Sequence, residues 1–200
     1  FYGGIYRDLN IIAVSESHFD LEYYGTPGIK VTPEVVGKDA KVEVEVFVKN
    51  VKETQKLVYT LKDAEGNVVA EQETPASQTV ASFEIENVHL WHGKKDPYLY
   101  TAEVCLKDEE EVLDNVSARF GCRTFEIHPE NGFILNGEEY PLRGVSRHQD
   151  RWGIGNALLK EHHDEDMDLI CELGATTIRL AHYQHDQYFY DLCDERGMVV

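Results

Sequence analysis

The sequence LRGVSRH at residues 142–148, echoed by TTIRLAH at residues 176–182, decides the fold of the last third of this 200-residue chain. Both are short runs of strand length that end in a histidine. Residues 158–173 lie between them and repeat apolar side chains at helical spacing, and residues 187–196 fit a second helix. Residues 198–200 look like the middle of a third strand. The predicted helix boundaries are Gly174, which ends the first helix, Asp186, which caps the second, and Gly197, which ends it. This order predicts two right-handed strand–helix–strand units that share a strand.

The two histidines stand at equivalent places in this pattern. His148 and His182 follow neighbouring strands, so in a parallel sheet both lie at the carboxyl edge, where ligand sites form. There they can donate hydrogen bonds to a ligand, although two structural histidines near a loop would show the same pattern. Arg143, Arg147 and Arg179 accompany them, and a buried arginine needs an acidic partner, either inside a barrel or in an ordinary ion pair.

Other polar groups in this region are further candidates for a site. Trp152 follows the first strand and is a candidate to line a pocket. The cluster His162-His163-Asp164-Glu165-Asp166 looks like a metal site, but on a helix only His162 and Asp166 share a face and His163 points about 100° away. Because two ligands are too few, a solvated helix face is the prediction. No pair of carboxylates stands out as catalytic, and the sequence has no nucleophile elbow, P-loop or dinucleotide fingerprint.

Period-two alternation dominates residues 29–123. Val42, Val44, Val46 and Val48 alternate with polar positions, and further short runs are separated by turn residues such as those at 63–67. About seven short strands in this span predict an immunoglobulin-like β-sandwich. Residues 1–28 contain a predicted strand at Leu9–Val14 and look like the trailing edge of a preceding domain. The predicted fold is therefore a mostly β immunoglobulin-like sandwich followed by an incomplete α/β segment, residues 124–200.

Composition narrows the classes of partner. The net charge of −18 argues against binding to nucleic acid and to an anionic membrane surface. No stretch approaches the ~20 apolar residues of a membrane span. The four cysteines show no metal-like spacing, are predicted to be small buried hydrophobes, and slightly favour a cytoplasmic, reducing compartment. The chain starts with Phe1 rather than Met, so we expect it to be part of a longer protein, and a signal peptide before it stays open.

Several motifs together resemble β-galactosidases of glycoside hydrolase family 2. The motifs that carry this resemblance, in chain order, are Gly4-Ile5-Tyr6-Arg7-Asp8, Asn131-Gly132-Phe133 with Leu135-Asn136-Gly137, Leu142–His148, Ile178–Tyr183 and Phe189–Gly197. The resemblance implies a jelly-roll sugar-binding domain that ends in residues 1–28, a sandwich at 29–123, and the start of a (β/α)8 catalytic barrel at 124–200. Departures at Ser146, Gln149 and Gln184 concern the shape of the sugar pocket.

The resemblance also implies roles for individual residues. The histidines matching His148 and His182 bind the galactosyl group, Arg179 organises the barrel interior, and Arg143 supports the mouth. With Trp152, these are the predicted substrate-binding residues. The acid/base and nucleophilic glutamates, and the ligands of Mg²⁺ and Na⁺, would lie beyond these residues, so no metal or catalytic residue is predicted here.

The parent protein is thus expected to hydrolyse terminal β-D-galactosides with retention, and this chain alone is expected to be inactive. β-Glucuronidase or β-mannosidase activity of the same family is the alternative, and a non-catalytic structural or glycan-binding module is a further one. Three parallel strands out of eight would leave sheet edges unpaired, so we also expect residues after about 125 to be poorly ordered, rearranged or buried against another copy, with self-association of the barrel segment.

Overall fold

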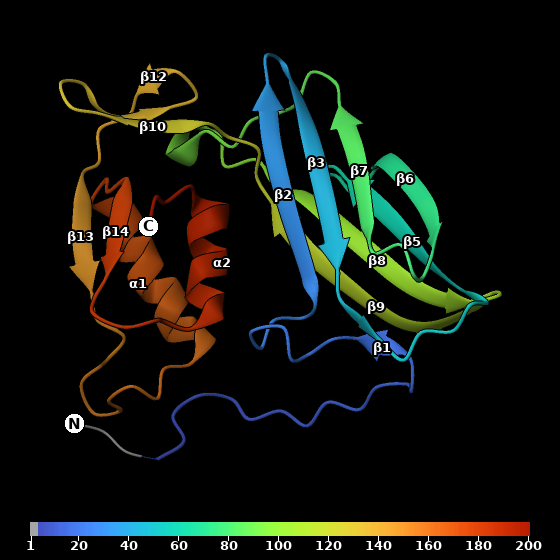
Figure 1. Cartoon of the computed structure of the whole chain (residues 1–200). Helices are drawn as coiled ribbons and strands as arrows, with labels where there is room; N and C mark the ends of the chain where they lie inside the picture. Colours follow the sequence, from blue (N-terminus) through green and yellow to red (C-terminus); the bar gives the residue numbers. More distant parts are fainter. Residues whose placement is uncertain (1–3) are drawn as a thin grey trace. The chain divides into compact units, whose positions relative to one another are not determined.

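The computed structural model describes residues 4–200, and the predicted trailing segment at 1–28 therefore begins outside the described residues. The chain divides into two compact units, each described by itself (Figure 1). The sandwich unit comprises Ile12–Leu90 and Tyr98–Thr124. The α/β unit comprises the chain up to Ile11, together with Trp91–Pro97 and Phe125–Val200. The predicted domain boundaries at 28/29 and 123/124 stay predictions.

Two antiparallel sheets form the sandwich unit. The smaller has the order β2-β3-β7, with β2 at Ile29–Val36, β3 at Asp39–Val46 and β7 at Val80–Ile85. The larger has the order β6-β5-β8-β9, with β6 at Val68–Pro75, β5 at Gln55–Lys62, β8 at Tyr100–Asp108 and β9 at Glu111–Phe120. Seven strands in two sheets confirm the sandwich that the period-two pattern predicted.

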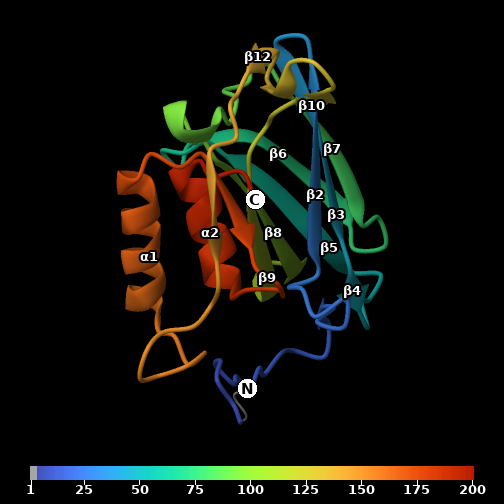
Figure 2. The same cartoon turned by 90° about the vertical axis from the view of Figure 1, so that its left-hand side faces the viewer.

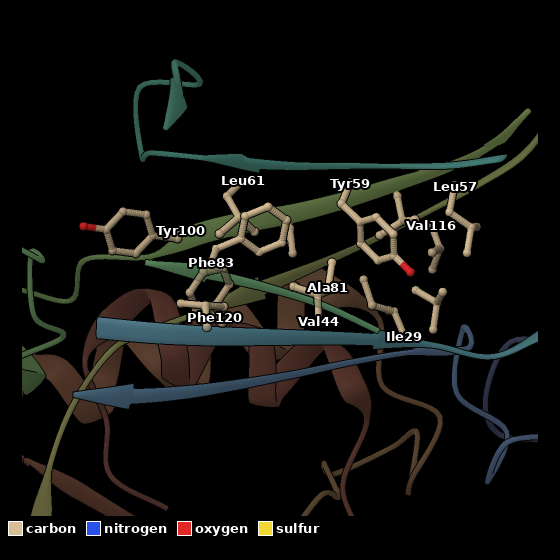
Figure 3. Packing of buried hydrophobic residues seen from close by; sticks show 14 of the residues in the cluster. Ile29, Val44, Leu57, Tyr59, Leu61, Ala81, Phe83, Tyr100, Val116 and Phe120 are labelled. Atoms are coloured by element: carbon tan, nitrogen blue, oxygen red, sulfur yellow. The ribbon is translucent and has the colours of Figure 1, made fainter. Parts of the chain in front are cut away.

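Alternate residues of each strand build the sandwich core. In β3, Val42, Val44 and Val46 are at most 1% exposed, while the residues between them face outward. Leu57, Tyr59 and other inward residues of the larger sheet pack against them, as Figure 3 shows. Each fully buried side chain of this size stabilises the fold by about 1.5–3 kcal/mol, so the pattern in the sequence and the stability of the sandwich have the same origin.

Two details at the edge of the sandwich differ from the sequence pattern. Phe47 interrupts the alternation because β3 ends at Val46; its ring stacks on Tyr23 at 3.8 Å, and the chain continues into β4 (Val48–Lys49), which pairs with β1 (His18–Phe19). The strand predicted at Leu9–Val14 is wrong: these residues form no strand and are exposed. An apolar run becomes a strand only when another strand accepts its backbone hydrogen bonds.

The α/β unit begins with a small antiparallel sheet of β10 (Phe125–His128), β11 (Gly132–Leu135) and β12 (Glu138–Glu139). The chain then runs through β13 (Gly144–Arg147), α1 (Lys160–Glu172), β14 (Thr177–Leu180) and α2 (Gln187–Arg196). β13 and β14 are parallel, and Thr177 bridges Val199 in parallel, which is where the third strand was predicted. The fold class predicted from the sequence is confirmed, whereas self-association stays a prediction.

The two helices pack on one face of the parallel pair and lie side by side (Figures 1 and 2). The core that they share contains Met167, Ile170, Ile178, Phe189 and Leu192, all at most 7% exposed. The predicted cap of α2 is confirmed, because the Asp186 side chain accepts a hydrogen bond from the backbone N–H of Tyr188 at 2.9 Å. Its predicted end is confirmed as well: Gly197 has a φ of 70°.

A short piece of chain between β7 and β8 belongs to the α/β unit. It contains the 3-10 helix η1 (Gly93–Lys95) and Trp91, which is 2% exposed and donates its indole N–H to the Asp194 carbonyl at 2.9 Å. Gly197 approaches this segment so closely that a Cβ there would lie 2.2 Å from the Gly93 carbonyl oxygen. Among residues 4–200, no helix is long and apolar enough to cross a membrane.

Candidate functional site

The parallel pairing of β13 and β14 brings the two predicted histidines together. The register pairs Arg147 with Leu180, so His148 and His182 both follow the carboxyl ends of their strands. Their ring centroids are 5.1 Å apart, with an interplanar angle of 80°. Both side chains are exposed, so a ligand can reach them. The spatial relation that the sequence predicted for this pair is thus present, and its role in binding stays a proposal.

Arg179 adds a positive charge to this histidine pair. It lies on β14 opposite Ser146 of β13, and its exposed side chain is on the face away from the buried Ile178. Its Nη2 donates to Nδ1 of His182 at 2.9 Å. A guanidinium only donates, so this Nδ1 is unprotonated and the imidazole N–H of His182 is at Nε2. We call His148, His182 and Arg179 the rim group.

Arg147, which precedes His148, is the centre of a buried polar network. Its side chain points to the helices, and its Nε and Nη2 donate to Oδ2 of Asp166 at 2.9 and 2.7 Å. Its Nη2 also donates to His163 Nδ1 at 3.0 Å, and its Nη1 donates to His185 Nδ1 at 3.1 Å. The guanidinium lies 3.8 Å from the ring centroid of Phe189. The acidic partner that a buried arginine requires is therefore Asp166, on α1.

The charge of Arg147 and the lack of water act together on the two network histidines. Both are 2% exposed. Burial lowers the pKa of His163, and the positive charge of Arg147 lowers it further. Burial also lowers the pKa of His185, where Arg147 acts in the same direction and a hydrogen bond to the Ala181 carbonyl opposes it. Both imidazoles are therefore neutral acceptors toward the arginine, which the distances to their Nδ1 atoms require independently.

Gln149 ties the two strand-end loops together on the other side of His148. It is 1% exposed, and its Oε1 accepts a hydrogen bond from the backbone N–H of Asp186 at 2.6 Å. Its own backbone N–H donates to the hydroxyl of Tyr183 at 3.1 Å. His148 is thus exposed between two buried neighbours, each of which is bonded to the segment that carries His182. The alternation of exposed and buried residues in β13 continues past its end, so His148 is exposed while Arg147 and Gln149 are buried.

Two other residues predicted to bind substrate lie apart from this arrangement. Arg143 precedes β13, where its backbone N–H donates to Thr176 Oγ1 at 2.9 Å, so it lies at the amino end of the strand pair and His148 at the carboxyl end. Five residues of extended chain separate them by about 16 Å. The structure therefore does not bring Arg143 to the mouth. Trp152 is 100% exposed and lines a shallow hollow formed by its own loop, residues 150–155.

The charged start of α1 corrects the prediction of a solvated helix face. His163 is buried and Asp166 binds Arg147, because this face of α1 packs on the arginine and on α2. His162 instead caps the helix, with its Nδ1 accepting the backbone N–H of Leu159 at 2.9 Å. In the described part of the chain, no three His, Cys, Asp or Glu side chains are placed to hold a metal ion. Ions implied by the family resemblance would need ligands from elsewhere.

Sequence reasoning missed the network residues other than Arg147. His163 and Asp166 stand out in the sequence only as part of a cluster predicted to lie on a solvated helix face, Gln149 only as a departure in the sugar pocket, and His185 is assigned no role. The available signal was the arginine itself, since a buried guanidinium requires several acceptors within reach. Which acceptors it finds depends on how α1 packs, and the sequence pattern does not fix this.

Two models of known protein families match this chain, one before and one after residue 124. The model for glycosyl hydrolases family 2 matches residues 27–123, and the model for the TIM barrel domain of the same family matches residues 125–200.

Individual relatives agree with these matches. A β-glucuronidase of Bacteroides fragilis is 36% identical over 100% of the chain, which spans 30% of that protein. A β-galactosidase of Thermoanaerobacter pseudethanolicus is 30% identical over 100% of the chain, which spans 27% of it. The crystal structure of an FMN-binding β-glucuronidase from Facaelibacterium prausnitzii L2-6 superposes with a TM-score of 0.90 at 45% identity, and the match covers 92% of this chain and 29% of that one.

Proposed function

Since this chain belongs to glycosyl hydrolase family 2, as the matches to two family models show, we propose that it contributes the rim of the sugar-binding site in a β-glycosidase. The family assignment made from the sequence motifs is confirmed. The observation that supports the proposed role is the rim group: two exposed imidazoles 5.1 Å apart, with a guanidinium bonded to one of them, at the carboxyl ends of parallel strands. Ligand sites in α/β barrels are built at that edge.

Each member of the rim group has a distinct chemical role in this proposal. The Nε2–H of His182 donates to a sugar hydroxyl, since its Nδ1 already accepts from Arg179. His148 contacts the same ring from the neighbouring strand. The exposed guanidinium of Arg179 orients His182 and makes this edge positive. Donors held in place before the substrate arrives stabilise charge that develops during glycosidic cleavage without having to reorganise.

Bond cleavage itself requires two carboxyl groups that act in concert. In the retaining mechanism that we propose, one protonates the leaving oxygen and the other forms a covalent glycosyl-enzyme intermediate. We assign this pair to parts of the protein outside residues 1–200, as the family resemblance implies. The 200-residue chain by itself should therefore bind sugar at most weakly and turn over no β-glycoside.

Two substrate classes are supported, and we place β-glucuronides first. The 36% identical relative and the 45% identical solved structure are both named β-glucuronidases, and a uronate carboxylate would find an opposite charge in Arg179. β-Galactosides, which the sequence motifs predict, are supported by the relative of that name at 30% identity.

The experiment uses the whole protein that contains this chain. Hydrolysis of p-nitrophenyl β-D-glucuronide and p-nitrophenyl β-D-galactoside is compared through kcat/KM, and the larger value identifies the substrate class. His182→Ala should reduce kcat/KM about 10²–10³-fold, the usual loss for one donor to developing charge. His128→Ala, at an exposed histidine of β10, is the control and should leave the rate unchanged. A whole protein that hydrolyses neither glycoside, or full activity in His182→Ala, would refute the proposal.

A further inference from the structure

His185 occupies a position that links the rim group to the buried network. It lies three residues after His182, in the loop between β14 and α2, and is 2% exposed. Its Nδ1 is 3.1 Å from Nη1 of Arg147, and its Nε2 is 3.3 Å from the carbonyl oxygen of Ala181. Both ring nitrogens are therefore in hydrogen bonds, although the side chain itself does not reach the surface.

The partners of the ring determine its protonation state. Arg147 can only donate, so Nδ1 of His185 must be the acceptor. The Ala181 carbonyl can only accept, so Nε2 must carry the hydrogen and donate. His185 is thus neutral, in the Nε2–H tautomer. The lowered pKa of this side chain, which burial causes first, agrees with that state.

The carbonyl that His185 holds is part of the peptide that leads into His182. The N–H of Ala181 donates to the Arg147 carbonyl at 2.9 Å, so the residue before His182 is bonded through both its N–H and its carbonyl. Arg147, for its part, directly precedes His148. One imidazole therefore connects the residue before His148 with the residue before His182.

We propose that His185 is a positioning residue. It holds the Ala181 carbonyl and the Arg147 guanidinium, and thereby keeps the rings of His148 and His182 at the 5.1 Å separation from which both can contact one sugar. This rests on the proposed function of the rim group. Misplacing a binding group by about 1 Å can reduce the rate of an enzyme about 10²-fold. Gln149 supports the same geometry through its bonds to Asp186 and Tyr183, and neither of these bonds involves the Ala181 carbonyl or the guanidinium.

The first experiment measures histidine ring signals of the 200-residue chain by ¹⁵N-edited NMR at neutral pH. In the unsubstituted protein His185 should show an acceptor Nδ1 and a protonated Nε2, and the ring protons of His148 and His182 should show a mutual NOE. A protonated Nδ1 at His185, or a cationic ring, would overturn the proposal without any variant.

Substitutions then separate positioning from stability. His185→Leu removes both bonds, and we expect the NOE between the rim rings to disappear and the Nε2–H tautomer of His182 to be lost. His185→Gln carries one acceptor and one donor, and should restore both signals at least in part. His163→Leu is the matched control, because it also removes an acceptor from Arg147 but has no bond to the Ala181 carbonyl. Unchanged rim signals in a folded His185→Leu, or equal changes in His163→Leu, would refute the positioning role. If His185→Leu does not fold, His185→Gln and the tautomer measurement decide.

Kinetics of the whole protein complete the test. His185→Leu should lower kcat/KM at least about tenfold, with recovery in His185→Gln and little change in His163→Leu. If no variant or parent hydrolyses a glycoside, the proposed function fails while the NMR result still decides the role of His185. If the rim signals do not depend on His185 but the parent is active, only the positioning role fails.

Discussion

Replacing Arg147 by Met should destabilise the α/β unit by about 3 kcal/mol. The substitution removes two bonds to Asp166 and leaves the Nδ1 atoms of His163 and His185 without their donor. Breaking a buried ion pair costs about 3–5 kcal/mol, and a buried acceptor without a partner costs about 1–3 kcal/mol. The side chain of Asp166 is 32% exposed, so water can partly hydrate its carboxylate, and Met regains some apolar contact with Phe189. Because of these two effects, the expected loss lies at the lower end of the range for breaking a buried ion pair, at about 3 kcal/mol.

Tryptophan fluorescence during urea unfolding measures this loss selectively. The chain has two tryptophans, Trp91 and Trp152, and both belong to the α/β unit. With a slope of about 1 kcal/mol per molar urea for a unit of this size, the transition midpoint should fall by about 3 M. Arg147→Lys keeps a charge for Asp166 but has no planar fork to reach both histidines, so a loss of about 1–2 kcal/mol is expected.

A matched control is available in a second arginine whose acidic partner lies on the same helix, α1. Arg151 forms a 2.6 Å ion pair with Glu165 of α1, and these side chains are 37% and 53% exposed. Arg151→Met should therefore cost less than about 1 kcal/mol. If Arg147→Met shifts the midpoint no further than Arg151→Met does, the buried network contributes no more than a surface pair. If Arg147→Met is more stable than the unsubstituted protein, the free-energy cost of burying the guanidinium exceeds the stabilisation from its hydrogen bonds. Either result would refute the reasoning.

Three further predictions concern other parts of the chain. Gly197→Ala should destabilise the α/β unit by about 2–4 kcal/mol, because an unfavourable φ combines with a clash at the Gly93 carbonyl. Gly174→Ala is the control: Gly174 also has a positive φ, but nothing lies within 4 Å of the new Cβ. Urea unfolding of this control should show a smaller loss of stability, about 1–2 kcal/mol. The pKa values of His163 and His185, the two buried network histidines, are lowered from 6.5 in the folded protein, so below that pH the unfolded chain binds more protons than the folded chain does. The free energy of unfolding should therefore be highest above about pH 6.5 and fall as the pH drops. A free energy of unfolding that rises as the pH drops would contradict this. Burial raises the pKa of Cys122 to about 11 and that of Cys193 to about 12, so at about pH 8 an aromatic disulfide reagent should label these two thiols only after unfolding; fast labelling of all four cysteines in the folded protein would show that this is wrong.

The sequence predicted those parts of the fold that depend on local periodicity. Alternation at Val42, Val44 and Val46 identified a sandwich strand because each position has a fixed face. The cap at Asp186 and the stop at Gly197 could be predicted because each satisfies helix-end groups within a few residues.

What could not be predicted depends on packing between distant segments. The phase of α1 around its axis decides whether His163 faces water or Arg147, and the weakly amphipathic, charge-rich helix allows either. At the rim, chain order and the parallel sheet were enough to bring His148 and His182 together. The place of Arg143 at the mouth was implied by the family resemblance instead, and in the structure this residue precedes β13, at the amino end.

The seven residues Trp91–Pro97 make the two units inseparable by a single cut. They are encoded between two sandwich strands, yet three of their hydrogen bonds join them to residues 125–200 of the α/β unit. The Trp91 indole donates to the Asp194 carbonyl, the Lys94 backbone N–H donates to the Tyr140 hydroxyl, and the Trp91 carbonyl accepts from the Asn136 side chain. A chimera assembled by joining foreign sequence at residue 124 would strip the downstream half of these partners. Recombination that exchanges residues 125–200 between homologues should therefore give a folded protein only when the donor also supplies its sandwich, or at least its counterpart of Trp91–Pro97.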